Sequence, residues 1–509
     1  MINTNISNTV VDIPDTNLNI VLHNTLGIAV DVPLTSDDLA MVTLLDASNA
    51  SIVDLTGMQY CINLSIADFS HNSINSLAPL SNLVTITELD ISNNVISDIT
   101  TLASLSNLIT LTMVAVNTQA TEPDHLDLSV LNNFKNIKAL DISNNQITKA
   151  NIIGQLISLK TLKAEEFAID TNESQFLANL VNLKSLITSD GKYTSIDFLS
   201  TMIAIEYIAL SRCSMFHDVT PLKDLQKLNY LAITQNSLIY NITPITENPS
   251  IKVLHFVDSI INPSPITNMV NLTELQVNNC GLSNLDFISG CSSLISLDAN
   301  TSTISDISPL KALTHLEILT MQYSNVSDIS AVTDMPALTS LNILNGLITT
   351  ARPVLNNPNI TSLNLGFNFL TSPDEYDLLK LRFENDAFLS YNYIYGRLEQ
   401  FAFYYNAPSI VLNIGETITK TFVEYLTLDG IVYSPSGIQK LSLNYCNVIS
   451  NDENIAKILS VNIDPNTSSI NIDLSGVSVG NTVLEIVGSN NSTLLPFTSG
   501  EYSIPVSVN

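Results

Sequence analysis

The sequence predicts an α/β solenoid of leucine-rich repeats, capped by helices at its N-terminus and followed by an all-β sandwich of immunoglobulin type. Two observations predict the solenoid. An apolar marker residue, usually leucine, returns sixteen times, mostly at steps of 22 residues. The segments around it follow the pattern L-x-x-L-x-L-x-x-N-x-I of leucine-rich repeats. We therefore expect about sixteen parallel strands on a concave face, with short 3-10 or helical turns on the convex side.

The strands are placed by the phase of the repeat, which is clearest in ELDISNNVISDI at Glu88–Ile99. With Leu89 as the marker of its strand, the equivalent markers are Leu45, Ala67, Leu111, Leu140, Leu162, Leu186, Ile208, Leu231, Leu254, Leu275, Leu297, Leu319, Leu341, Leu363 and Ala387. Leu89 and Ile91 are expected to point into the core, because side chains alternate along a strand. The residues one, three and four positions after each marker are expected on the exposed concave face.

Two further features of the repeat predict local structure. An asparagine five residues after the marker, as at Asn94, can bond its side-chain amide to the backbone of adjacent repeats. The convex return often carries a Pro-Leu pair, as at Thr220-Pro221-Leu222, and proline there suits the first position of a helical turn. We therefore expect an asparagine ladder inside the solenoid and short helical turns outside it.

The domain boundaries follow from where the repeat begins and ends. Residues 1–11 are polar and are expected to be a flexible N-terminus. Residues 12–40 are predicted to form a helical cap, with one helix ending at Gly27 and a second over Thr35–Leu45, because an open solenoid end would expose its core. The solenoid is predicted over residues 41–405, with an insertion around Thr118–Asp127 and a capping helix near residues 372–385.

Residues 409–509 no longer follow the repeat and carry short alternating segments separated by turn residues such as Asp429-Gly430. About seven short strands in a hundred residues predict a small immunoglobulin-like β-sandwich. The segment has no cysteine pair and the chain has no tryptophan, so the core of an antibody domain is not expected.

The five cysteines do not predict a disulfide framework, because their number is odd and they are widely scattered. They are Cys61, Cys213, Cys280, Cys291 and Cys446. Cys213 and Cys280 stand at the ladder position, where leucine-rich repeats accept Asn or Cys. Cys61 and Cys291 share a position six residues before the marker. We interpret these four as structural rather than metal-binding or redox-active.

The composition excludes several classes of partner. The net charge is −29, with only 19 Lys and Arg residues. A field of this sign repels nucleic-acid phosphates and anionic lipid head groups, so neither is expected as a partner. The chain contains no run of about 18 apolar residues, so insertion into a membrane is not expected. The first residues, MINTNISNTVVDIPD, lack the basic and apolar regions of a signal peptide, so none is expected.

Catalysis, cofactors and metals are not expected either. The chain has no G-x-S-x-G, H-E-x-x-H, P-loop or dinucleotide-binding glycine motif. Its six histidines are dispersed and show no metal-ligand spacing. Glu165 and Glu166 are adjacent carboxylates, which we interpret as a solvated pair rather than an acid/base couple.

The motifs I-S-D-I and L-D-I-S-N-N, a helical cap opening on I-P-D and an immunoglobulin-like module after the last repeat resemble those of bacterial internalins and related surface proteins. The resemblance covers roughly residues 12–509. It implies a non-enzymatic protein at the cell surface or outside the cell, which grips a host protein or glycan with its concave face. The chain departs from the family in its irregular repeat lengths and sparse positive charge.

Most exposed concave positions carry the repeat consensus of Asp, Ser and Asn, and we interpret these residues as a solvated face. The candidate ligand-binding residues are the concave positions that depart from this consensus. They are Arg212, His255, Tyr323, Leu344, Phe367, Phe388 and Tyr391. Exposed aromatic side chains on a rigid sheet are typical of binding hot spots. The alternative is that Phe367, Phe388 and Tyr391 are covered by the C-terminal cap or the sandwich.

Two functions are compatible with these features. The first is a non-enzymatic adhesion or host-recognition protein that binds a protein or glycan on its concave face. The second is a structural or decoration protein of a surface appendage, a surface layer or a phage virion. In the second case the assembly contacts would be made through the C-terminal sandwich.

Overall fold

The computed structural model describes residues 9–116, residues 125–366 apart from 168, 170, 214, 237, 238 and 260, scattered positions between 368 and 383, and strands between 410 and 508. The chain divides into two compact units, Met1–Leu389 and Ser390–Asn509. The predicted boundary at residues 405–409 lies outside the described residues.

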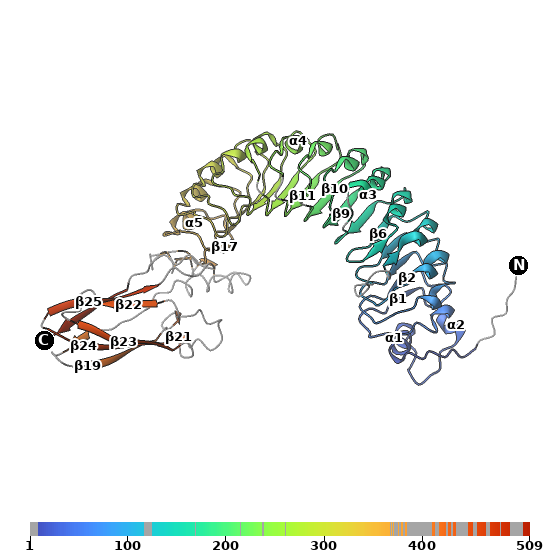
Figure 1. The fold of residues 1–509 in the computed structure, drawn as a ribbon, viewed down its shortest axis with the longest axis horizontal. Coiled ribbons are helices and arrows are strands. Elements are labelled where there is room, and N and C mark those ends of the chain that lie inside the picture. The colour runs from blue at the N-terminus through green and yellow to red at the C-terminus, as the bar shows by residue number, and fades with distance from the viewer. Residues whose placement is uncertain are drawn as a thin grey trace. The chain divides into compact units, whose positions relative to one another are not determined.

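The first unit is a leucine-rich-repeat solenoid. Fifteen strands form one sheet in chain order on the inner side of its arc, and helical turns follow the outer side (Figure 1). The strands are β1 (Leu44–Asp46), β2 (Ile66–Asp68), β3 (Glu88–Asp90), β4 (Thr110–Thr112), β6 (Ala139–Asp141), β8 (Thr161–Ala164), β9 (Ser185–Ser189), β10 (Tyr207–Ser211), β11 (Tyr230–Thr234), β12 (Val253–Val257), β13 (Glu274–Asn278), β14 (Ser296–Asp298), β15 (Ile318–Thr320), β16 (Ser340–Asn342) and β17 (Ser362–Asn364). All fourteen pairings between them are parallel.

The register confirms the predicted phase. Each marker from Leu45 to Leu363 is the Cα partner of the marker in the next strand. These fifteen side chains are buried and fill the core behind the sheet. The sixteenth predicted strand, around Ala387, lies outside the described residues.

The convex side is built from short turns, as predicted. The helices there are α3 (Thr171–Ser174), α4 (Thr243–Thr246) and α5 (Arg352–Asn356), and α3 continues into a 3-10 turn at Gln175–Asn179. The other repeats use 3-10 turns at Met58–Tyr60, Ala78–Leu80, Thr100–Ser104, Leu128–Asn133, Ala150–Gln155, Asp197–Thr201, Thr220–Leu222, Ser264–Asn268, Asp286–Ile288, Ser308–Ala312 and Ser330–Asp334. Proline occupies the first turn at Pro79, Pro221 and Pro309, where its missing N–H has no helical partner to lose. The predicted insertion around Thr118–Asp127 lies mostly outside the described residues, and β5 (Leu126–Asp127) then pairs with β7 (Ile147–Thr148).

The predicted asparagine ladder is present. Asn94 accepts a hydrogen bond from the Ile74 N–H at 2.9 Å and donates to the Phe69 carbonyl at 3.0 Å. Asn72, Asn145 and Asn368 make equivalent bonds between neighbouring repeats. Each amide therefore satisfies backbone groups that the turn after the strand would leave unpaired in the core.

The N-terminal cap begins with α1 (Thr16–Leu26), which confirms the first predicted helix. The carboxylate of Asp15 accepts hydrogen bonds from the first turn, and Gly27 ends the helix with a left-handed φ of 67°. Leu18 and Leu22 are fully buried and cover the first repeat. Residues before α1 also pair, since Val10 forms an antiparallel bridge with Thr35.

The second predicted helix, over Thr35–Leu45, is wrong beyond its first turn. Thr35 and Asp38 form a capping box that starts α2, but α2 covers only Ser36–Leu39. Leu44 and Leu45 belong instead to β1, which pairs with β2. The reason is that the sheet needs this segment as its first strand, and edge pairing outweighs a weak local helical preference.

The C-terminal end of the solenoid is closed by Arg382. Its guanidinium donates hydrogen bonds to the carbonyls of Val354, Asn357 and Ile360 at 2.6, 2.7 and 2.6 Å. Within the predicted capping helix near residues 372–385, the positions that the structure describes, 375, 378, 379, 382 and 383, are helical.

The described part of the second unit is all β. Its strands are β18 (Ile410–Leu412), β19 (Thr417–Val423), β20 (Leu426–Leu428), β21 (Ile431–Tyr433), β22 (Cys446–Ser450), β23 (Ala456–Asp464), β24 (Ser469–Gly476), β25 (Gly480–Gly488) and β26 (Tyr502–Val508). They form sheets in the orders β18-β26-β25-β22 and β19-β24-β23, with β20-β21 as a separate pair. The immunoglobulin topology remains a prediction.

Candidate functional site

The strands are longest in the middle of the solenoid sheet. The five strands β9 to β13 have five residues each, whereas the others have three, or four in β8. In several of the short strands the residue directly after the marker is an aspartate. In β2 and β3 this residue is Asp68 or Asp90, and its carboxylate accepts a hydrogen bond from the N–H two residues on at 2.8 Å.

The central strands lack this carboxylate. Ile187, Ala209, Ala232 and His255 replace it in β9 to β12, and the pairing continues to the fifth residue of each strand. We call the concave surface of β9 to β13 the central face. Small and apolar side chains along its middle leave the flanking side chains accessible from the concave side.

Two stacked tyrosines flank this central face. Tyr207 and Tyr230 stand one residue before the markers of β10 and β11, and their rings are parallel within 9° with centroids 4.0 Å apart. The sequence prediction missed them, because it assigned the exposed positions only after each marker. The signal was present, since alternation along a strand puts the residues before and after the marker on the same face.

His255 connects this stack to the next strands. Its Nδ1 lies 3.0 Å from the Tyr230 hydroxyl and its Nε2 lies 2.8 Å from Oε1 of Glu274. Because an ionised carboxylate only accepts hydrogen bonds, Nε2 donates to Glu274, and the Nδ1 of a neutral ring accepts from Tyr230. The His255 side chain is only 15% exposed. Burial, followed by the neighbouring Tyr207 hydroxyl, raises the pKa of Tyr230 above its ordinary value.

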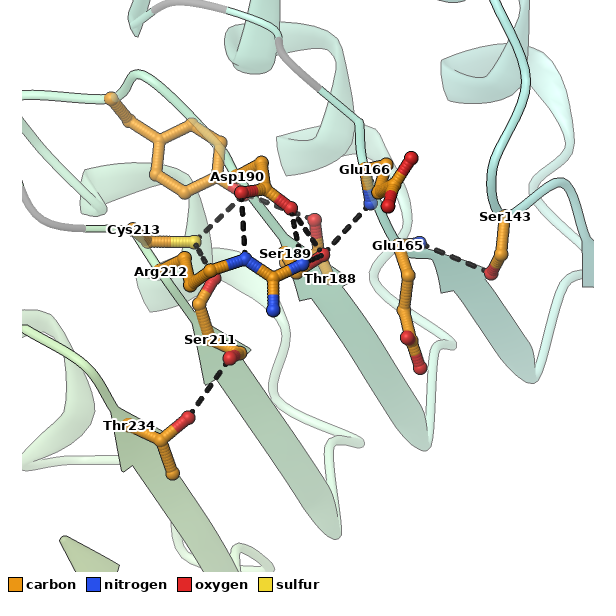
Figure 2. Close-up of polar contacts among 11 residues, drawn as sticks. Ser143, Glu165, Glu166, Thr188, Ser189, Asp190, Ser211, Arg212, Cys213 and Thr234 are labelled. Atoms are coloured by element: carbon orange, nitrogen blue, oxygen red, sulfur yellow. Dashed lines mark hydrogen bonds and ion pairs between the residues drawn. The ribbon is translucent and has the colours of Figure 1, made fainter. Parts of the chain in front are cut away.

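A charged pair borders the central face at the ends of β9 and β10. The guanidinium of Arg212 donates from Nε and Nη2 to the two carboxylate oxygens of Asp190 at 2.8 and 2.7 Å (Figure 2). Ser189 also donates to Asp190. These contacts, that of Arg212 being the largest, outweigh burial and hold the pKa of Asp190 below its usual range.

The adjacent carboxylates Glu165 and Glu166 do not form an acid/base couple with each other. Figure 2 shows their side chains pointing in different directions from the end of β8. The backbone N–H of Glu165 donates to Ser143 Oγ at 3.1 Å, and that of Glu166 donates to Ser189 Oγ at 2.8 Å. Both side chains are exposed, as a solvated pair requires.

The predicted exposure of the residue three positions after the marker is wrong for several repeats. Ser70, Ser92 and Ser143 are buried. The Ser92 hydroxyl accepts the Val114 N–H at 3.0 Å, so it serves the backbone of the next repeat rather than the concave surface. A small hydroxyl side chain can turn toward the neighbouring backbone, which a bulky residue cannot do.

The structure describes four of the seven predicted site residues and does not bring these four into one cluster. Arg212 directly follows β10 at the border of the central face, and His255 lies within β12. Tyr323, which is 52% exposed, follows β15, and its N–H bonds to the carbonyl of Leu344 in the next repeat at 2.9 Å. Leu344 is half-buried. Phe367, Phe388 and Tyr391 lie outside the described residues, so their predicted role is untested.

The cysteines of the solenoid have structural surroundings. Cys61, Cys213, Cys280 and Cys291 are buried and unpaired. At the ladder position, Cys213 and Cys280 each donate to a backbone carbonyl at 3.3 Å. Burial raises the pKa of Cys61 to about 12 and that of Cys291 to about 11, so both remain thiols at neutral pH.

Two absences among the described residues bear on other functions. No group of three or more His, Cys, Asp or Glu side chains in this part of the chain is arranged to hold a metal ion. None of the helices that the structure describes combines the length and the apolar character that crossing a membrane requires.

Solved structures share this fold. No protein family and no curated protein matches the sequence. The functional domain of InlJ from Listeria monocytogenes, which includes a cysteine ladder, is 16% identical, with 97% of each chain covered and a TM-score of 0.54. A leucine-rich-repeat protein of Leptospira interrogans is 18% identical over 68% of this chain and 95% of its own, with a TM-score of 0.55. An internalin, InlF of Listeria monocytogenes, is 25% identical over 70% of this chain and 91% of its own, with a TM-score of 0.43.

The likenesses to InlJ and to the Leptospira protein, together with the parallel sheet of in-register repeats, define the fold class of the molecule. The protein is a leucine-rich-repeat solenoid protein whose concave sheet departs from its own repeat consensus in the central strands.

Proposed function

We propose that the protein is a non-enzymatic recognition protein that binds a protein or glycan ligand on the central face. One observation carries the proposal. In β9 to β12 the consensus aspartate is replaced, and the stacked Tyr207 and Tyr230 stand beside the small side chains that replace it. Tyrosines held rigidly on a sheet lose little conformational entropy on binding, which makes them effective contact residues.

The network around His255 supports the same proposal. Tyr230 is held by its stack with Tyr207 and by its bond to His255, and His255 is held in turn by Glu274. A binding surface gains affinity when its side chains are fixed before the ligand arrives. No packing requirement of the solenoid core needs these four side chains, because they lie on the side of the sheet opposite the buried markers.

The experiment is to screen the labelled full chain against arrays of extracellular proteins and of glycans, and to repeat each positive with a Y207A/Y230A variant. We expect the double variant to lose at least tenfold in affinity while its thermal unfolding stays close to that of the wild type. The matched control is Y240A, because Tyr240 is 64% exposed and lies outside the strands. A ligand that binds the double variant as tightly as the wild type would falsify the assignment of the central face.

We place the protein at the cell surface or outside the cell, as the likeness of its repeats to internalins suggests. Fractionation of the native source tests this placement, and recovery in the medium or at the surface is expected. Recovery with purified virions or appendages would instead favour a decoration protein that docks through the second unit.

A further inference from the structure

More than half of the positive charges of the chain lie in the repeats that contain or precede the central face. Residues 1–134 contain fourteen Asp and Glu residues and no Lys or Arg. Residues 135–252 contain eleven of the 19 Lys and Arg residues, matched by eleven acidic ones. The strongly negative field of the solenoid is therefore interrupted in its central repeats.

Three lysines form a row at the entry to the strands. Lys138, Lys160 and Lys184 each stand two residues before a marker in successive repeats. The Lys160 N–H bonds to the Lys138 carbonyl at 2.7 Å, and the Lys184 N–H bonds to the Lys160 carbonyl at 2.8 Å. The backbone thus fixes the three residues at the lateral spacing of a sheet, about 4.8 Å.

A fourth lysine stands on the concave side of the same strands. Lys163 follows the marker of β8 and is exposed, as is Lys138, and neither has an ion-pair partner in the part of the chain that the structure describes. Lys184 pairs with Glu206 at 2.7 Å, on the side of the row toward Tyr207. Asp141 is the lateral neighbour of Lys163, and its carboxylate accepts the Ser143 N–H. Lys138 and Lys160 stand side by side in neighbouring repeats. Like charges placed in this way repel each other, so this edge of the sheet favours an anionic ligand.

Small side chains separate the lysine row from Lys163. Ala139, Thr161 and Ser185 occupy the position one residue before the marker in β6, β8 and β9. The next residue in this column is Tyr207, the Cα partner of Ser185. Tyr230 covers one face of the Tyr207 ring, and a serine is too small to cover the other. The second ring face is therefore available to a ligand that lies over Thr161 and Ser185.

We propose that Lys138, Lys160, Lys163 and Lys184, with the open ring face of Tyr207, bind an acidic segment of a partner protein that carries an aromatic side chain. The inference rests on the proposed function and names the chemistry of the ligand. The aromatic side chain extends the Tyr207–Tyr230 stack, and carboxylates on its neighbours meet the lysines. Stacked aromatic pairs and charge-assisted hydrogen bonds are both stronger than ordinary surface contacts.

A protein segment fits this surface better than a long polyanion does. Nucleic acids and sulfated glycans are negative along their whole length, and the N-terminal repeats would repel them beyond the lysine row. A folded partner carries both signs of charge, so an acidic segment can meet the lysines while neutral or basic groups face Asp46, Asp68 and Asp90 in β1 to β3. The Debye length of about 8 Å at physiological salt keeps these two regions electrostatically distinct.

The test uses the full chain and three capped hexapeptides, titrated by calorimetry at low salt. The first contains three glutamates and one tyrosine, the second has alanine in place of the tyrosine, and the third has glutamines in place of the glutamates. We expect the first to bind most tightly and the third not to bind. A K138Q/K160Q/K163Q variant should weaken binding of both acidic peptides at least tenfold. Tyr207→Ala should abolish only the advantage that tyrosine gives to the first peptide.

The matched control is K223Q/K311Q/R352Q, which changes the net charge by the same amount away from this surface and should leave affinity within twofold. Equal losses in the two triple variants would show only a long-range charge effect and would overturn the proposal. So would a tyrosine advantage that survives Tyr207→Ala, or tighter lysine-dependent binding of a heparin hexasaccharide or a DNA hexanucleotide. A screened ligand that needs Tyr207 and Tyr230 but not the lysines would overturn this inference and leave the proposed function standing.

Discussion

Arg212 binds Asp190 through two hydrogen bonds, and both residues occupy the same position in neighbouring repeats, four residues after the marker. Both have a left-handed backbone, with φ of 52° and 61°, as does every residue at this position from Asn49 to Asn345. Such a conformation costs roughly 1–2 kcal/mol for an L residue. The repeat imposes this backbone conformation at every copy of the position. Which side chain stands there is therefore decided by its contacts, as in the Asp190–Arg212 pair, rather than by the backbone preference of the residue.

The coupling between Asp190 and Arg212 should be small and salt-dependent. The two side chains are 34% and 48% exposed, and exposed pairs of this kind contribute about 0.2–1 kcal/mol. We expect a double-mutant cycle with Asp190→Asn and Arg212→Gln, measured by urea unfolding, to give a coupling in this range that falls at 1 M salt. A coupling above about 2 kcal/mol, or one insensitive to salt, would contradict this account.

The parts of the fold that repeat could be predicted from the sequence, because the same physical requirement recurs in each turn. Leu89 and its equivalents fill one core. Asn94 and its equivalents bond backbone groups that would otherwise be unpaired after each strand. Every copy of the repeat therefore shows the same structural requirement. The cap was harder. The segment that contains Leu44 has both a helical pattern and a strand phase, and only the presence of β2 beside it decides between them.

The site was predicted less completely, because its contacts join side chains that stand at different positions in different repeats. Tyr230 and Glu274 precede their markers and His255 follows its own, and the hydrogen bonds between them depend on side-chain rotamers. The departure from consensus at His255 was visible in the sequence, whereas its hydrogen bonds to Tyr230 and Glu274 were not.

Gly290 should not tolerate a side chain. A Cβ there would lie 1.8 Å from the backbone carbonyl oxygen of Thr267, in the preceding repeat. A backbone atom cannot move aside as a flexible side chain can, so we expect Gly290→Ala to lower the free energy of unfolding by about 2–3 kcal/mol. Gly281→Ala is the matched control. Its Cβ would meet nothing, so only its φ of 69° is strained, and about 1 kcal/mol is expected. Equal losses of stability in the two variants would show that the close contact between Gly290 and Thr267 does not determine the cost of a side chain.

Arg382 should be the most sensitive position at the C-terminal end of the solenoid. Its guanidinium serves three carbonyls at once and lies 5.0 Å from the Phe383 ring centroid. An ammonium group lacks this planar fork of donors. We therefore expect Arg382→Lys and Arg382→Ala to destabilise the protein similarly, by about 2–3 kcal/mol, because buried carbonyls lose their partners. Arg352→Ala, at an exposed site, should cost less than about 1 kcal/mol. Rescue of stability by lysine at position 382 would show that charge alone is needed.

The carboxylate of Asp15 joins the N-terminal cap to the first repeat. It accepts the N–H groups of Asn17 and Leu18 at 2.9 and 3.0 Å, and those of Val53 and Asp54 at 2.7 and 3.0 Å. Burial alone would raise the pKa of Asp15, but these four donors together outweigh burial and lower it. One oxygen thus caps α1 while the other fixes the loop after β1.

The stability that Asp15 contributes should therefore disappear in acid. A carboxyl group whose pKa is depressed by folding stabilises the folded state fully above its unfolded pKa, near 4, and loses this contribution as the pH falls through the folded value. We expect Asp15→Asn to lower the free energy of unfolding by about 1–2 kcal/mol at pH 7, the range of helix N-caps, and the difference from wild type to shrink steadily below pH 4. Chemical unfolding at a series of pH values measures this difference. Asp31→Asn is the control, because Asp31 is exposed and its replacement should cost little stability at pH 7. If Asp15→Asn lowers the free energy of unfolding by the same amount down to pH 2.5, the asparagine amide fits poorly for steric reasons, and the charge of Asp15 does not hold the cap in place.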